Sequence, residues 1–144
     1  MIVRIENGKL AQVINLLYDL PLRGKQSRYR TKFIKLLNAQ LEEYRQDFEQ
    51  LLKEHCHLDE NGEPIVKDDN TYDVKDVEAY LKDKKELDEE VFVIESVSKQ
   101  DMLKTVKEIL MNCDREFSGQ EAMIYDYICE KFEEAEKEEK KGDK

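Results

Sequence analysis

The residues best suited to chemistry lie near the middle of the chain. His55, Cys56 and His57 are adjacent, and imidazole and thiolate groups are common zinc ligands. Neighbouring side chains of a helix point about 100° apart, so these three do not converge easily on one ion. No second pair of ligands follows at zinc spacing. We therefore predict structural roles for the three residues, with no metal and no cofactor.

The acid-rich stretch of residues 57–76 invites comparison with a calcium-binding loop. An EF-hand needs acidic or amide ligands at positions 1, 3 and 5, glycine at position 6 and glutamate at position 12. With Gly62 at position 6, positions 3 and 5 match, but position 1 holds His57 and position 12 holds Asp68. The first and last ligands fail, so the stretch predicts no EF-hand. Adventitious calcium binding stays open.

Catalytic signatures are missing from the sequence. It has no G-x-S-x-G motif, and its five glycines form no phosphate-binding loop. Neither histidine has an evident nucleophile as a partner. Carboxylates are so numerous, at 34, that the proximity of two of them carries no information. We predict that the protein is not an enzyme.

Six cations occur close together near the start of the longest predicted helix, without an acid among them: Arg23, Lys25, Arg28, Arg30, Lys32 and Lys35. Positive charge at a helix N-terminus opposes the macrodipole, and a departure from a local rule is a hint of function. One interpretation is binding of an external partner, such as a phosphate, an acidic protein surface or nucleic acid. The other is an internal clasp with the acidic half of the fold, or a solvated face. We take the six as candidate partner-binding residues.

The net charge of −10 is unevenly distributed. Residues 1–58 carry +3, whereas residues 59–144 carry −13. The overall charge repels a phosphate polyanion, so direct nucleic-acid binding is disfavoured. Residues 83–90 and the C-terminal tail form strongly acidic segments, which are either solvated faces or a mimic of nucleic-acid phosphates that occupies a basic groove of a partner.

Hydrophobic periodicity predicts a mostly helical α+β domain with about four to five helices and a small antiparallel sheet. The long helix, over about 27–56 with Ser27 as its N-cap, would span about 45 Å and needs a partner helix in this chain or in another copy. Asn7 is expected to cap the first helix, and Ser118 and Glu121 to form a capping box for the last. In the first part of the chain, the predicted order is a strand over 2–5, a helix over 9–19, the long helix and a hairpin over 64–74 with its tip at 69–70. A helix over 77–90 follows, and then a strand over 90–97 that pairs with the first strand. The last two elements are a helix from 98 or 100 to 113 and a helix over about 119–132.

The domain is expected to be single, over residues 1–132, with a charged and frayed tail over 133–144. No stretch approaches the ~20 apolar residues of a membrane helix, so we predict no membrane association. The first residues lack a basic region followed by an apolar run, so we expect no signal peptide. Cys56, Cys113 and Cys129 are odd in number and distant from one another, which favours reduced thiols.

Several short motifs resemble those of a family of small uncharacterised proteins of tailed phages and prophages of Gram-positive bacteria. They are the opening I-x-N-G-K-L at residues 5–10, the segment L-P-L-R-G-K-Q-S-R-Y-R at 20–30 followed by F-I-K-L-L at 33–37, the turn D-E-N-G-E-P-I at 59–65 and F-S-G at 117–119. The resemblance is one of order and spacing over nearly the whole chain. It implies a setting, the cytoplasm of a host bacterial cell, and no activity or functional residue.

Two functions fit these observations. The first is a protein–protein interaction role as an accessory, assembly or adaptor protein, in which the long helix favours a homo-oligomer. The second is inhibition of a host defence enzyme, such as a CRISPR nuclease, by an acidic surface that blocks its nucleic-acid groove.

Overall fold

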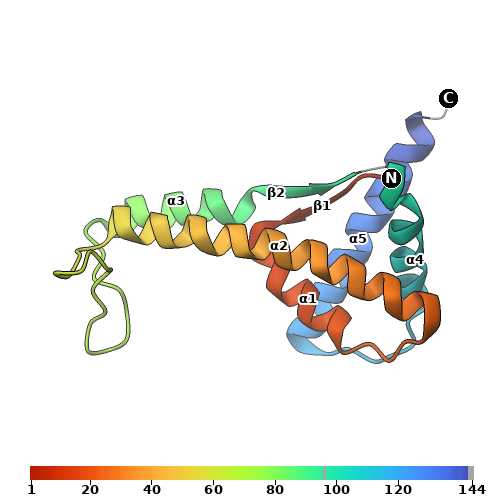
Figure 1. Cartoon of the computed structure of the whole chain (residues 1–144), viewed down its shortest axis with the longest axis horizontal. Coiled ribbons are helices and arrows are strands. Elements are labelled where there is room, and N and C mark those ends of the chain that lie inside the picture. Colours follow the sequence, from red (N-terminus) through yellow and green to blue (C-terminus); the bar gives the residue numbers. More distant parts are fainter. Residues whose placement is uncertain (96, 143–144) are drawn as a thin grey trace.

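The computed structural model describes residues 1–95 and 97–142, which form five α-helices and a two-stranded sheet (Figure 1). This confirms the predicted helical α+β fold with one long helix. In chain order the elements are β1 (Val3–Glu6), η1 (Asn7–Lys9), α1 (Leu10–Tyr18), α2 (Gly24–His55), α3 (Val77–Glu89), β2 (Val91–Ile94), η2 (Val97–Lys99), α4 (Gln100–Met111) and α5 (Gly119–Gly142). No described helix has the length and apolar character that crossing a bilayer requires.

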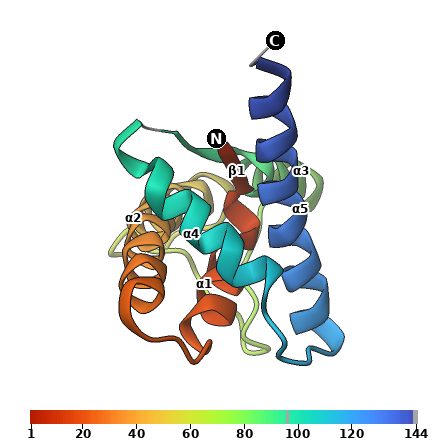
Figure 2. The same ribbon diagram turned by 90° about the vertical axis from the view of Figure 1, so that its right-hand side faces the viewer.

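The long helix α2 divides the molecule into two parts. Its N-terminal half packs with α1, α4 and α5, which we call the body (Figures 1 and 2). Its C-terminal half projects from the body and runs beside α3 (Figure 1). We call residues 44–90 the arm. Residues 25–55 contain no glycine or proline, so the helix continues from the body into the arm without a break.

The core lies in the body. Phe33, Ile34, Leu37 and Leu41 recur at helical spacing on α2 and are buried there. The ring of Phe33 meets that of Phe132 on α5, with 5.8 Å between the ring centroids. The buried side chains of the other body helices are Leu10, Val13, Leu16 and Leu17 of α1, Met102, Leu103, Val106, Ile109 and Leu110 of α4, and Ile124, Ile128, Phe132 and Ala135 of α5.

The predicted pairing of the two strands is confirmed. β1 and β2 are antiparallel, with Val3 opposite Ile94 and Ile5 opposite Phe92. Val3, Ile5 and Ile94 are buried, as expected when alternate residues of a strand face the core. The ribbon connects the arm to the body, because β2 follows α3 directly.

One predicted helix start differs from the structure. α2 begins at Gly24, three residues before Ser27, and its N-cap is Arg23. Gly24 has a φ of 61°, a conformation that glycine adopts without steric strain. α5 begins at Gly119, as predicted, but Glu121, the expected partner of Ser118 in a capping box, makes an ion pair with Arg115 at 3.2 Å.

The expected frayed tail over 133–144 is corrected for residues 133–142, because α5 continues as a helix to Gly142. Residues 143–144 lie outside the described residues. Ala135 is 1% exposed and extends the apolar stripe of the helix beyond Phe132. Glu136 pairs with Lys107, and Glu138 pairs with Arg4 at 2.7 Å. The segment is rich in glutamate and lysine, which are strong helix formers. The folded part therefore extends about a turn and a half or more past residue 132.

Asn7 is also placed differently from the prediction of an N-cap. Its side chain is 3% exposed and its amide nitrogen donates a hydrogen bond to the carbonyl of Leu87 at 3.2 Å. Its side-chain oxygen accepts a hydrogen bond from Gln40 at 3.1 Å. Asn7 thus joins α2 and α3 at the base of the arm.

The end of the arm is an irregular ribbon over residues 56–76. Bridges join Cys56 to Val74, Leu58 to Pro64 and Val66 to Tyr72. The turn at Asp69–Asn70 lies where the sequence predicts it, and Asn70 has a φ of 66°. Asp69 accepts hydrogen bonds from the amide and hydroxyl of Thr71, which lower the pKa of its carboxyl group.

Candidate functional site

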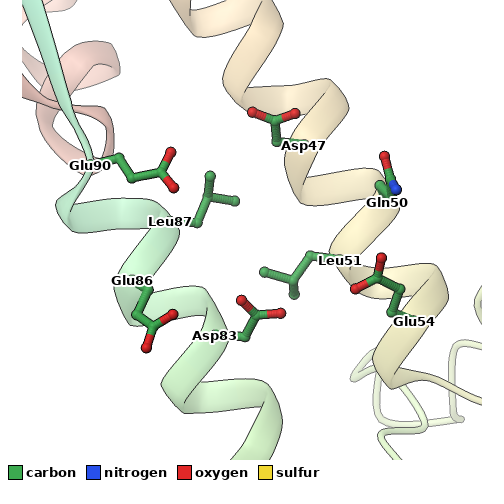
Figure 3. A pocket seen from close by; sticks show the side chains of 8 residues that line it. All are labelled: Asp47, Gln50, Leu51, Glu54, Asp83, Glu86, Leu87 and Glu90. Carbon is green, nitrogen blue, oxygen red and sulfur yellow. The ribbon is translucent and has the colours of Figure 1, made fainter.

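A groove of about 240 Å³ runs between α2 and α3 on the arm (Figure 3). Its floor contains Leu51 and Leu87, which are 5% and 8% exposed. Five carboxylates and one amide surround these leucines: Asp47, Gln50 and Glu54 from α2, Asp83 and Glu86 from α3, and Glu90 just after α3. No lysine or arginine lines the groove among the described residues. The arrangement is an apolar floor inside an acidic rim.

Helical spacing explains why these acids meet. Asp47 and Glu54 are seven residues apart, about two turns, so they lie on one side of α2. Asp83 and Glu86 are three residues apart and share a face of α3, and Glu90 follows four residues later at the end of the helix. Burial of the two leucines brings these faces together. Carboxylates held so close repel one another, which favours binding of a cation or a basic side chain.

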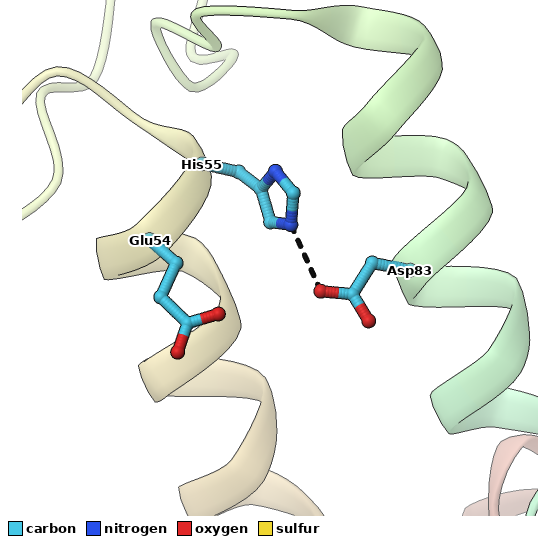
Figure 4. Close-up of side chains that lie close together, drawn as sticks. All are labelled: Glu54, His55 and Asp83. Atoms are coloured by element: carbon cyan, nitrogen blue, oxygen red, sulfur yellow. Dashed lines mark hydrogen bonds and ion pairs between the residues drawn. The ribbon is translucent and has the colours of Figure 1, made fainter.

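His55 lies at the distal end of this groove (Figure 4). Its Nε2 atom is 2.9 Å from Oδ2 of Asp83, and its ring packs edge-on against Tyr80, with 6.0 Å between centroids. Ligand atoms of Glu54, His55 and Asp83 all lie within 4.8 Å of one another. Imidazole with carboxylates is a donor set that zinc and manganese accept. This trio is the closest approach to a metal site in the part of the chain that the structure describes.

The three residues of the histidine–cysteine–histidine motif lie in different environments. Cys56 is fully buried, where desolvation raises the pKa of its thiol. His57 has an exposed side chain. His55 therefore meets the neighbouring helix rather than the two residues next to it in the sequence. The cross-helix partner Asp83 could not be predicted from the motif.

The stretch compared with a calcium-binding loop contains a turn held by hydrogen bonds among its own residues. Oδ1 of Asp59 accepts hydrogen bonds from the amides of Asn61 at 2.9 Å and Glu63 at 3.0 Å. The amide of Gly62 donates to the carbonyl of Asp59 at 3.0 Å. The carboxylate of Asp59 thus stabilises a tight turn of its own backbone, as aspartate often does.

A second side of the arm carries a half-buried polar pair, Tyr44 and Asp88. The hydroxyl of Tyr44 donates a hydrogen bond of 2.5 Å to Asp88, and Lys84 pairs with the same carboxylate at 2.7 Å. Burial, followed by this hydrogen bond, raises the pKa of Tyr44 well above its usual range. The pair joins α2 to α3 near the body.

The six candidate cations do not form one surface. Arg30 has an internal role, because its guanidinium donates hydrogen bonds to the carbonyls of Leu17 at 2.9 Å and Leu20 at 2.7 Å. These are carbonyls at the C-terminal end of α1 and just beyond it, where a cation is favourable. For this residue the structure supports the internal interpretation, although its partners are backbone carbonyls and not the acidic half.

The other five cations are exposed. Lys25 pairs with Asp101 at 3.4 Å, with both side chains more than half exposed. Lys25 and Lys32 also lie over the ring of Tyr29, at 5.3 Å and 5.2 Å from its centroid. The remaining three, Arg23, Arg28 and Lys35, make no ion pair with any described residue.

No protein-family model, no curated protein and no solved structure matches this chain. The resemblance to small phage proteins therefore rests on the sequence motifs. In the structure, the first of these motifs forms the end of β1, η1 and the first residue of α1, and the second runs from the connection after α1 into the first turns of α2. These two motifs thus lie where elements join, and no residue of any of the motifs lines the acidic groove.

The distal end of the arm carries a further hollow, of about 330 Å³. Leu52, Pro64, Val66 and Tyr72 supply its apolar walls, and Glu49, Lys53 and Glu63 supply charges around it. Val66 and Tyr72 are 54% and 40% exposed. Sequence reasoning did not find this surface, because it depends on the way in which the irregular ribbon folds back on α2.

Proposed function

We propose that this chain is a non-enzymatic protein-interaction module that presents its arm to a protein partner. Following the sequence resemblance, the setting is a tailed phage or prophage in the cytoplasm of a host bacterial cell. The partner is a phage protein, a host protein or a second copy, and the role is that of an accessory, assembly or adaptor protein. The supporting observation is the concentration of exposed apolar side chains on the arm.

Five large apolar side chains of the arm are between 40% and 59% exposed: Leu58, Val66, Tyr72, Val77 and Leu81. Single exposed apolar residues are common, whereas a group of them with polar residues around it is typical of an interaction site. Val66 and Tyr72 are cross-strand neighbours, and both line the hollow beside Glu49 and Lys53. This combination of apolar centre and charged rim is the usual composition of a protein interface.

The state of the nucleophilic groups supports the non-enzymatic part of the proposal. Burial raises the pKa values of the thiols of Cys56 and Cys129, which disfavours reactive thiolates. His55 is engaged by the carboxylate of Asp83. The net charge of −10 also disfavours direct nucleic-acid binding.

The test is a pull-down from lysate of a phage-infected or lysogenic Gram-positive host with the tagged full chain. We expect Val66→Asp together with Tyr72→Asp to lose a protein that the unchanged chain captures. Val97→Asp is the matched control, because Val97 is 95% exposed but belongs to the body. Equal capture by all three proteins would contradict a role for the arm.

The acidic groove favours a second candidate function, inhibition of a host defence enzyme such as a CRISPR nuclease. The five groove carboxylates occupy a compact area, whereas Glu136, Glu138 and Glu139 of the tail pair with cations of the body. Mimicry of phosphates would therefore be concentrated on the arm. A basic nucleic-acid groove is the kind of surface that such an acidic patch complements.

This candidate predicts inhibition of nuclease cleavage that weakens as the salt concentration rises. Asp83→Asn with Glu86→Gln would relieve the inhibition, whereas Val66→Asp would leave it intact. Inhibition that is indifferent to both salt and groove charge would contradict the mimic.

A further inference from the structure

One exposed stripe of α2 changes sign along its length. Lys25, Lys32, Glu43 and Glu54 are all exposed. The last three lie 7, 18 and 29 residues after Lys25, and at 3.6 residues per turn each of them falls within about 20° of Lys25 around the helix. The stripe is therefore basic at the N-terminal end of the helix and acidic at its C-terminal end.

The acidic groove strengthens the acidic end. Asp47 lies about 40° from the stripe on the same side of α2. The groove adds Asp83, Glu86 and Glu90 beside it from the other helix. The basic end is reinforced by Arg28, which is exposed and makes no ion pair with any described residue.

The two ends cannot neutralise each other within one molecule. Lys25 and Glu54 are separated by 29 residues of continuous helix, which is about 44 Å at 1.5 Å per residue. The intramolecular partner of Lys25 is Asp101, and with 55% and 69% of these side chains exposed the ion pair is weak and exchangeable. The complementarity along α2 is thus available to another molecule.

An antiparallel second copy satisfies both ends at once. A two-fold axis that crosses α2 between residues 39 and 40 places Lys25 opposite Glu54 of the second copy. The same axis places Lys32 opposite Asp47, because both pairs have the same midpoint in the sequence. Symmetry then repeats both contacts, which gives a closed dimer. Ala39, exposed and small, lies at the centre of the stripe and permits close approach of the two helices.

We propose that a second copy of this chain docks antiparallel along this stripe of α2, with the basic end of each helix at the acidic groove of the other. This inference rests on the proposed function as a protein-interaction module and names one partner for it. It also gives the exposed members of the basic run an external role, while Arg30 keeps its internal one.

The experiment is sedimentation velocity with the full chain over a range of concentrations. The unchanged chain forms a dimer. Variant A, Lys25→Glu with Lys32→Glu, and variant B, Asp47→Lys with Glu54→Lys, each place like charges opposite one another. Each variant alone is expected to dimerise at least roughly tenfold more weakly. An equimolar mixture restores the dimer, because every reversed end of A meets a reversed end of B.

The matched control reverses charges of α2 outside the stripe, with Arg45→Glu and Glu49→Lys in one chain. These positions lie more than about 100° from the stripe, and the net charge is unchanged. The control dimerises as the unchanged chain does. Far-UV circular dichroism verifies that all variants are folded.

Three outcomes would overturn the inference: a chain that stays monomeric, variants that dimerise normally, or a mixture of A and B that remains monomeric. A monomeric chain that captures a basic host protein through the groove would assign the groove to that protein. In that case the inference fails, whereas the proposed interaction function survives. If the pull-down captures no partner but the chain still forms the dimer, the inference stands and the proposed interaction with another protein fails.

Discussion

Replacing Arg30 with alanine removes the cation from the C-terminal end of α1 and leaves the exposed cations around it in place. The guanidinium of Arg30 is half-buried and donates hydrogen bonds to the carbonyls of Leu17 and Leu20. Without it, both carbonyls lose a charged donor in a region that water reaches only in part. The connection between α1 and α2 then loses its principal polar contact.

The magnitude follows from these contacts. A hydrogen bond to a charged group contributes roughly 1.5–3 kcal/mol, and a cation at a helix C-terminus adds about 0.3–1 kcal/mol. Both hydrogen bonds come from one nitrogen, so the contributions are not independent. We expect a loss of about 2–4 kcal/mol in the free energy of unfolding. For a chain of this size, that corresponds to a fall in Tm of roughly 6–12 °C.

The assay is urea unfolding followed by circular dichroism at 222 nm, because the chain has no tryptophan. Arg28→Ala is the matched control, since Arg28 is exposed and makes no ion pair with any described residue. It should change the free energy of unfolding by less than about 0.5 kcal/mol. Arg30→Lys should fall between the two, because a lysine supplies the charge without the planar fork. Equal effects of Arg30→Ala and Arg28→Ala would refute the internal role of Arg30.

Three further predictions concern the arm and the tail. Asn7→Ala should lower the free energy of unfolding by about 1–3 kcal/mol in urea titrations, because the carbonyl of Leu87 and the side-chain amide of Gln40 both lose their hydrogen-bond partner. The control Asn15→Ala, at an exposed position, should have little effect. Ala135→Asp should lower the free energy of unfolding by about 2 kcal/mol or more, because it buries a carboxylate. The control Lys137→Asp, at an exposed position, should leave the Tm unchanged. Equal Tm values for the two variants would mean that the tail is not packed. The raised pKa of Tyr44 means that its contribution to stability is complete below pH 10 and falls as the pH rises further. Thermal scans of Tyr44→Phe across this range should therefore show a smaller alkaline loss than those of the unchanged chain.

The helices and strands could be predicted because local patterns determine them. The apolar residues of α2 recur at helical spacing without a break, and β2 is rich in β-branched residues. The tail could not be predicted in this way. Burial of Ala135 depends on where α5 crosses the body, and the partners of Glu136 and Glu138 are Lys107 and Arg4, which are distant in the sequence.

The candidate site was less accessible to sequence reasoning. With 34 acids in the chain, nothing marks Asp47 and Glu54 as neighbours of Asp83 and Glu86 until α2 and α3 are aligned. That alignment depends on the burial of Leu51 and Leu87 and on the hydrogen bonds by which Asn7 joins α2 to α3. The sequence shows the basic run as one group, but it does not show which of its cations are internal and which are exposed. Whether a cation is internal depends on which helix end it faces, and only Arg30 faces the end of α1.

The arm owes its orientation to the body more than to its own packing. Its buried apolar residues are Leu51, Leu52, Cys56 and Leu87, a core too small to fold by itself. The first tether is α2, which passes from the body into the arm as one helix. The second is η1, where Gly8 lies so close to α3 that a Cβ atom there would be 3.2 Å from Cβ of Asp88. Together with β2, which continues directly from α3 into the sheet, these two tethers fix the direction of the arm. The acidic groove is therefore held at a set distance and angle from the basic end of α2, which is the geometry that a symmetric, two-ended contact requires.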